Sequence, residues 1–140
     1  MNKIGFKLKK INTDQFAYID DAYDDENDEF NLETNIGFGI DSSNSAIKSS
    51  VKIQFEQNEK PFLIIEASCE FDIDPKMWKD FTDETKVKIP KGFMAHLAVI
   101  TVGTTRGILH DKTENTPYNE FILPTLNVAD MIKEDVEFKL

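Results

Sequence analysis

Cysteine is nearly absent from this sequence, since Cys69 is the only one in 140 residues. A single cysteine excludes a framework of intrachain disulfides and is typical of a protein of the reducing cytoplasm. Histidine is also scarce, and neither His96 nor His110 has a second His or Cys at a spacing used by metal ligands. We therefore expect a cytoplasmic protein with no metal and no other cofactor.

Long apolar runs and an excess of positive charge are missing as well. No run approaches the roughly 18 apolar residues of a membrane span. The first ten residues interleave lysines with apolar residues, which differs from the apolar block of a signal peptide. A net charge of −10 argues against unspecific nucleic-acid binding, which needs a cationic surface. We expect neither membrane insertion nor a nucleic-acid partner.

Motifs that carry chemistry are not found. No glycine-rich phosphate loop is present. The acidic run 20–29 fails as a calcium loop, because a loop starting at Asp24 would place Glu29 where glycine is required. We interpret this run as a flexible, solvated hairpin loop. Cys69 lies on the apolar side of a predicted strand, which favours an inert buried thiol over a nucleophile. We therefore expect a protein without enzymatic activity.

The first half of the chain alternates apolar and polar residues with a period of two. This pattern predicts half-buried β-strands over residues 3–8, 29–41, 47–56 and 62–73. Short connections between them favour antiparallel neighbours. The length of the chain, residues 1–140, suits a single domain. We predict an α+β fold with a four-stranded antiparallel sheet whose apolar face needs a cover.

The segment 92–110, which contains "HLAVITVGTTRGIL", is predicted to be a long helix that supplies this cover. Helical periodicity places five residues on one stripe facing the sheet: Phe93, Leu97, Ile100, Thr104 and Ile108. Its β-branched residues lower helix propensity, but its length exceeds that of a typical strand. Arg106 is expected to meet the last carbonyls of this helix.

The opposite side of the predicted helix is also apolar, and it carries Ala95, Ala98, Val99, Val102 and Leu109. A helix that is apolar all round is normally buried on both sides. We therefore expect a homo-oligomer, a dimer or a tetramer, in which these five residues form the subunit interface. The alternative is that the C-terminal segment of the same chain folds over them.

Two further segments complete the prediction. The crossover 74–92 carries Met77, Trp78 and Phe81, which either bind a partner or plug the end of the core. Asn127 and Asp130 predict a short final helix from Val128 to Lys133.

The order of these parts resembles the SecB family of bacterial export chaperones from about residue 4 to residue 132. The resemblance lies in "FLIIEASCEFDI" before the crossover, in "IPKGFMAHLAVITVGTTRGIL" ending in Arg106 and Gly107, and in "LPTLNVADMI". It implies a sheet with two helices, assembly as a dimer of dimers through the long helices, and ATP-independent holdase binding of unfolded polypeptides in protein export. It also implies a client-binding surface formed by Met77, Trp78, Phe81, Val128, Met131 and Ile132.

The sequence departs from the family pattern in two places. The connection "HDKTENTPYNEF" is longer than in the family, and the last helix is shorter. Docking of the SecA motor uses acidic positions on the outer sheet face, for which Glu66 and Glu70 are weak candidates. The departures argue against coupling to SecA. Two alternatives are a dedicated chaperone for one partner, of the toxin–antitoxin type, and a small-ligand or hot-dog-like enzyme.

Overall fold

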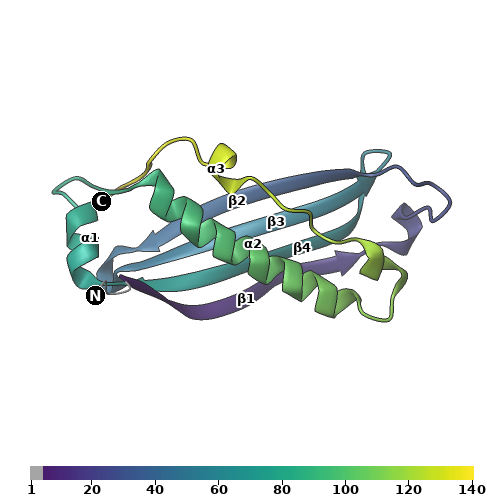
Figure 1. The fold of residues 1–140 in the computed structure, drawn as a ribbon, viewed down its shortest axis with the longest axis horizontal. Coiled ribbons are helices and arrows are strands. Elements are labelled where there is room, and N and C mark those ends of the chain that lie inside the picture. The colour runs from purple at the N-terminus through teal and green to yellow at the C-terminus, as the bar shows by residue number, and fades with distance from the viewer. Residues whose placement is uncertain (1–4) are drawn as a thin grey trace.

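The computed structural model describes residues 5–140, whose main antiparallel sheet is covered on one face by a long helix (Figure 1). The strands are β1 (Phe6–Tyr18), β2 (Asn31–Asp41), β3 (Ala46–Gln57) and β4 (Lys60–Ile73), and they lie in the order β1-β4-β3-β2. The predicted α+β class and the four antiparallel strands are thus confirmed.

Strand β1 is much longer than the predicted segment 3–8, of which residues 3 and 4 lie outside the described part. Its pairing with β4 shifts register between Leu8 and Lys10 and again between Thr13 and Gln15. Each shift inserts a residue and resets the alternation of faces, so no period of two runs through the strand. Such bulges are common on edge strands, where they hinder pairing with another chain.

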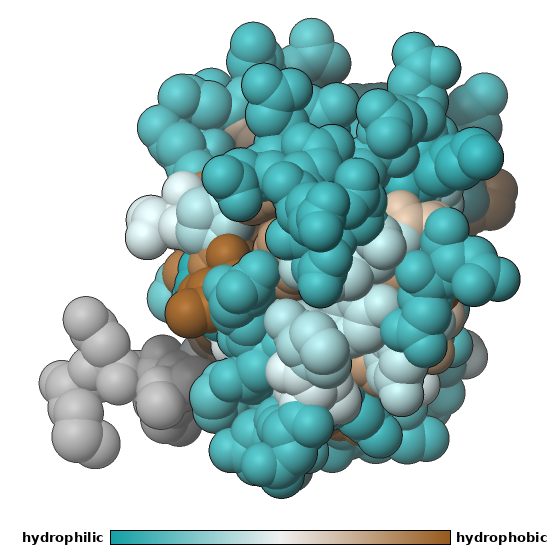
Figure 2. All heavy atoms as spheres, turned by 90° about the vertical axis from the view of Figure 1, so that its right-hand side faces the viewer, coloured by the Kyte–Doolittle hydropathy of each residue, from teal (hydrophilic) through white to brown (hydrophobic). Residues whose placement is uncertain are grey.

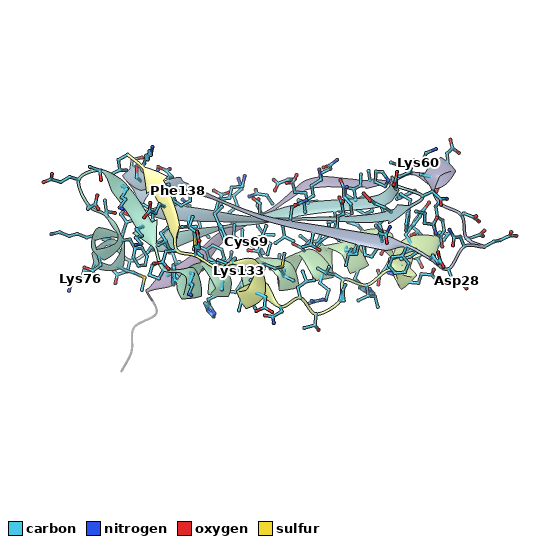
Figure 3. The ribbon with its side chains drawn as sticks, turned by 90° about the horizontal axis from the view of Figure 1, so that it is seen from above. Asp28, Lys60, Cys69, Lys76, Lys133 and Phe138 are labelled. Carbon is cyan, nitrogen blue, oxygen red and sulfur yellow. The ribbon has the colours of Figure 1, made fainter. Side chains whose placement is uncertain are left out.

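The long helix α2 (Lys91–Thr113) packs on the two central strands, β3 and β4. By length and composition it could cross a membrane, but much of one face is buried inside the protein. Figure 3 shows the sheet and the helix as two separate layers, with Cys69 between them. The sheet side of the core includes Val51, Ile53 and Ile65, none of which is exposed.

The buried face of α2 differs from the predicted stripe, which shares only Leu97 with it. The helix buries Met94, Leu97, Ala98, Thr101, Val102, Thr105, Leu109 and Thr113. Periodicity alone misplaced the stripe because it centred on Phe93, Ile100 and Ile108, which are only half-buried at the border of the buried face. Thr101 donates its hydroxyl to the carbonyl of Leu97, and Thr105 donates to that of Thr101, at 2.9 and 2.7 Å. With the hydroxyls satisfied inside the helix, these threonines pack as apolar residues.

Three of the five residues predicted at a subunit interface lie in the core of their own chain. Ala98, Val102 and Leu109 are buried in one cluster with Phe121 and Leu123 of the C-terminal segment. The alternative prediction, that this segment folds over the helix, is right for these three. Ala95 is half-buried, and Val99 alone keeps a largely exposed side chain, at 54%.

The predicted crossover loop contains regular structure. Helix α1 (Pro75–Phe81) starts at Asp74, whose side chain accepts from the amide of Lys76, and the short strand β5 (Lys86–Ile89) follows. Beyond α2 come the 3-10 turn η3 (Pro117–Glu120), helix α3 (Val128–Met131) and strand β6 (Val136–Lys139), which pairs with β5. Helix α3 ends two residues before the predicted Lys133.

The acidic segment 20–29 is largely exposed to solvent, as predicted, but it joins the two edge strands β1 and β2 and is not a hairpin loop. Its middle is tied to the sheet. The acidic segment begins with the 3-10 turn η1 (Asp20–Ala22). A second 3-10 turn, η2 (Ser42–Asn44), lies between β2 and β3. The Gln57 side chain is buried, and it bonds the backbone of Asp24 and of Asn27. The end view in Figure 2 shows the largely hydrophilic surface of this part of the molecule.

Candidate functional site

Exposed apolar side chains gather on the helix-covered side of the sheet, on both flanks of α2. Phe30, Ile122 and Met131 lie on the flank of the C-terminal segment and are 48%, 66% and 42% exposed. Leu8 and Ile11 lie on the edge strand β1 and are 41% and 50% exposed. Single exposed apolar residues are ordinary, but a row of them along one face marks an interaction surface.

The flank of the C-terminal segment is held in place by Arg106. Its Nε donates to the carbonyl of Leu123 at 2.9 Å, and its Nη2 donates to that of Pro124 at 3.1 Å. The guanidinium therefore holds the C-terminal segment against α2. The sequence had predicted instead that Arg106 contacts the last carbonyls of the helix. Because the segment is extended, Phe121 and Leu123 point into the core while Ile122 between them points out.

An aromatic cluster around Phe121 packs against the inner side of this flank. Phe121 packs against the rings of Phe30, Phe55, Phe62 and Tyr23 at centroid distances of 5.1 to 5.7 Å. Phe62 is the residue at which the pairing of β3 with β4 shifts register. Phe30 is thus an exposed aromatic residue whose ring is fixed edge-on against a buried one, which gives it a defined orientation toward solvent.

Two tyrosines join the acidic segment to this cluster. Tyr118 is buried, and its hydroxyl donates to the carboxylate of Asp20 at 2.5 Å. Burial and this hydrogen bond to a charged acceptor raise the pKa of Tyr118 far above its usual value. The pKa of Tyr23 is also raised, mainly by burial and then by Glu120, whose carboxylate lies 3.4 Å from the Tyr23 hydroxyl. Both phenols therefore stay neutral and keep donating.

The six residues predicted to bind clients fall into three classes of burial. Met131 is exposed, whereas Met77, Phe81 and Ile132 are half-buried. Trp78 and Val128 are buried at 7% and 3% exposure and do not lie on the surface of the single chain. Both side chains fill the core, because α1 and α3 turn their apolar faces inward. Ile132 packs against the same cluster as Trp78.

A shallow hollow of about 370 Å³ lies where α3 meets the start of α2. It is lined mainly by small or apolar residues, which include Gly92, Ala95, Ala129 and Ile132, with Lys133 at its border. Ala95, predicted at a subunit interface, thus faces α3 of its own chain. The hollow continues the exposed flank of Met131 toward the N-terminal end of α2.

The outer face of the sheet is polar and of mixed charge. Glu66 and Glu70 lie on it, each half-buried, as the alternation predicts. Glu66 pairs in register with Lys52, and Glu70 pairs with Lys48 on one side and Lys10 on the other. Lysines opposite both glutamates weaken any acidic patch here, which does not favour Glu66 and Glu70 as a docking site for a basic partner.

Within residues 5–140, no three His, Cys, Asp or Glu side chains converge in a way suited to a metal ion. His110 lies 3.5 Å from Glu114 in an exposed i, i+4 pair, and Cys69 is fully buried.

Comparisons with known proteins give a match among solved structures. No family model matches the sequence, and no curated protein is significantly similar to it. Among solved structures, the chain is similar to the Mycobacterium tuberculosis Rv1957 SecB-like chaperone, solved in complex with a ChAD peptide from the Rv1956 HigA1 antitoxin. The match has a TM-score of 0.53 at 16% identity and covers 86% of this chain and 90% of the other.

The chain has the SecB-like fold. The likeness extends over most of both chains, so it includes the sheet as well as the helical layer on it. At this identity the comparison establishes the SecB-like architecture only. The resemblance expected from the order of the sequence segments is confirmed at that level.

Two residues of the exposed apolar surface, Phe30 and Ile122, were not identified from the sequence. The sequence gave little signal for Ile122, because "FILPTL" is apolar at positions 121, 122, 123 and 126 and shows no period of two. Phe30 was assigned to the buried face of β2, but it precedes the strand and is exposed.

Proposed function

We propose that this protein is a chaperone that binds extended or unfolded polypeptide segments, without ATP and without catalysis. The observation that carries the proposal is the row of exposed apolar side chains along the C-terminal segment of a SecB-like fold: Phe30, Ile122 and Met131. The solved structure that shares the fold holds a peptide of an antitoxin, which supports polypeptides as the class of ligand.

The chemistry of this surface suits loose recognition of many sequences. Apolar contacts are non-directional, and the flexible thioether of Met131 adapts to side chains of different shape. Half-buried Leu32, Ile36 and Phe38 of β2 and Leu126 of the C-terminal segment extend the apolar area beside the exposed residues. Each contact is weak, so affinity comes from the number of contacts that one extended client makes at once.

The other flank of α2 fits a contact between subunits. Val99 and Gly103 are exposed on the helix, and Leu8 and Ile11 are exposed on β1 beside it. We propose that a second copy of the chain covers this surface in a homo-oligomer of the cytoplasm. Of the five interface residues expected from the sequence, only Val99 belongs to this surface.

The general holdase is tested by diluting a chemically unfolded client into buffer and measuring its light scattering with and without the protein. Suppression at a fixed stoichiometry without ATP is expected. The double variant Ile122→Glu/Met131→Glu should lose most of this suppression, because both charges fall on the apolar row. Thr125→Glu is the matched control, since Thr125 is exposed in the same segment. Equal suppression by the wild type and both variants would show that clients bind at a different surface.

A dedicated chaperone for one partner is the second candidate, and the antitoxin peptide bound to the similar structure favours it. It predicts no protection of generic clients and tight binding to one protein. Isolation of partners from the native cell with wild-type protein and with the Ile122→Glu/Met131→Glu variant as bait separates the two functions. A single partner, captured by the wild type and lost with the double variant, would support the dedicated role.

A further inference from the structure

The second sheet of the protein joins two segments that are far apart in the sequence. Strand β5 pairs antiparallel with β6, with Val87 opposite Phe138 and Lys88 opposite Glu137. Only four residues of each strand pair, and Figure 3 shows β6, with Phe138, at one end of the molecule. A two-stranded sheet of this size has little stability of its own.

Strand β6 is bound to β5 in the way an extended peptide ligand is bound. Val136 and Phe138 point toward the core, and Glu137 between them points out to Lys86, with 3.2 Å between carboxylate and ammonium. The amide of Leu140 donates to the carbonyl of Thr85 at 2.9 Å. Main-chain bonds with alternate side chains in pockets are the features of recognition by strand addition.

An acidic residue just before β6 adds a further contact. Asp135 accepts a hydrogen bond at 2.9 Å from the backbone amide of Lys91, the first residue of α2. Pro90, the residue at the helix N-cap, provides no such bond. The segment from Asp135 to Phe138 therefore alternates acidic and apolar residues. Each of its four side chains contacts β5, α2 or the core.

The surface beneath β6 is apolar and belongs to the second cluster of the core. Val87 and Ile89 have no exposed area, and Val136 and Phe138 pack against the cluster that also holds Trp78. Departure of β6 would expose the edge of β5 and apolar groups around it. The linking residues Lys133, Glu134 and Asp135 are exposed, so β6 can separate without disturbing α3.

We propose that the edge of β5 is a strand-addition site for extended polypeptides that alternate acidic and apolar residues, and that β6 is its resident occupant, which a client segment displaces. This inference rests on the proposed chaperone function and adds to it a second binding surface with a preference in charge. Lys86 and the amide of Lys91 select acidic side chains at the two positions that Glu137 and Asp135 hold here.

The test measures binding of a fluorescein-labelled peptide with the sequence of residues 133–140 to the full chain, by anisotropy. The double variant Val136→Ser/Phe138→Ser weakens the resident strand and leaves β5 intact. It should bind the peptide at least tenfold more tightly than the wild type, because the tethered competitor is weakened. A peptide carrying the same two serines has the same charge and should not bind.

A disulfide variant, Lys88→Cys/Glu137→Cys, locks β6 onto β5 and covers the case in which the serine variant does not fold. Its oxidised form should bind the peptide at least tenfold more weakly than its reduced form. Equal binding by both forms, or by the serine variant and the wild type, would overturn the inference. An unfolded client that the wild type protects should displace the peptide from the serine variant, and failure to do so would overturn it too. If the wild type protects no client, the proposed function fails, while the ranking of peptide affinities still decides the strand-addition site.

Discussion

Gln57 and Asp24 exchange two hydrogen bonds between a side chain and a backbone. The amide of Asp24 donates to Oε1 of Gln57 at 2.8 Å, and Nε2 of Gln57 donates to the carbonyl of Asp24 at 3.2 Å. The same Nε2 donates to the carbonyl of Asn27 at 3.1 Å. One buried side chain therefore holds the middle of a segment in which seven carboxylates repel one another between residues 20 and 29.

Gln57→Ala should release this acidic segment and lower the free energy of unfolding. Loss of the buried bonds is expected to cost about 1–3 kcal/mol, because backbone groups lose their partner. Urea denaturation measures the loss, and hydrogen exchange should rise in residues 23–29 while it stays unchanged in β4. An equal rise of hydrogen exchange in residues 23–29 and in β4 would show that the effect of Gln57 is not local.

Gln57→Glu provides the sharper comparison at the same position. It keeps the acceptor for Asp24 but removes both donated bonds and adds a carboxylate beside like charges. At pH 7 it should be less stable than Gln57→Ala, and lowering the pH through the carboxyl range near ~4 should bring the two variants together. A Glu variant as stable as the wild type at pH 7 would contradict this account.

Tyr118→Phe should lower stability by roughly 1 kcal/mol, since it removes a hydrogen bond to an exposed carboxylate. Because the pKa of Tyr118 is raised in the folded protein, its contribution is complete below the usual tyrosine pKa near ~10 and is lost as pH rises above it. The variant should therefore lose less stability than the wild type between about pH 9 and about pH 11, the range in which tyrosine titrates. Urea midpoints at both pH values measure this, with exposed Tyr18→Phe as the control.

Arg106→Lys should loosen the C-terminal segment while it keeps the positive charge. A lysine cannot donate to the carbonyls of Leu123 and Pro124 at once with the geometry of the guanidinium. We expect a loss of about 1–2 kcal/mol and faster hydrogen exchange in residues 121–127. Unchanged exchange there would mean that packing of Phe121 and Leu123 alone fixes the segment.

Val99→Glu should dissociate the proposed oligomer without unfolding the subunit. The side chain is exposed in the single chain, so the stability of the monomer should change by no more than about 0.5 kcal/mol. Sedimentation velocity should show a smaller species than the wild type. The control is Thr125→Glu on the opposite flank of α2, and equal dissociation by both variants would show that charge alone is responsible.

The sequence predicted the elements that follow one unbroken period and failed where the period breaks. Strands β2, β3 and β4 were located to within a few residues, since their alternation is regular. Strand β1 was cut short at Leu8, where its first bulge begins. The short strands β5 and β6 were not predicted, because four residues are too few to show a period of two. Their pairing also joins segments that are far apart in the sequence.

Prediction of the candidate site depended on deciding which apolar residues stay exposed. Trp78 and Val128 were chosen by residue type, although both are needed to fill the core. Ala98, Val102 and Leu109 were assigned to a partner because the sequence did not show that Phe121 and Leu123 return to them. Met131 is the one of the six residues that is exposed, and it ends the four-residue helix α3.

The buried threonines of α2 also bear on the order in which the protein forms during synthesis. Thr101, Thr105 and their β-branched neighbours give this segment a low intrinsic tendency to become helical, so its helix depends on contact with a finished sheet. All four strands of that sheet precede α2 in the chain and leave the ribosome before it. The composition of residues 91–113 is also compatible with a strand. Contact with the sheet that has already formed can therefore stabilise the helix in this segment.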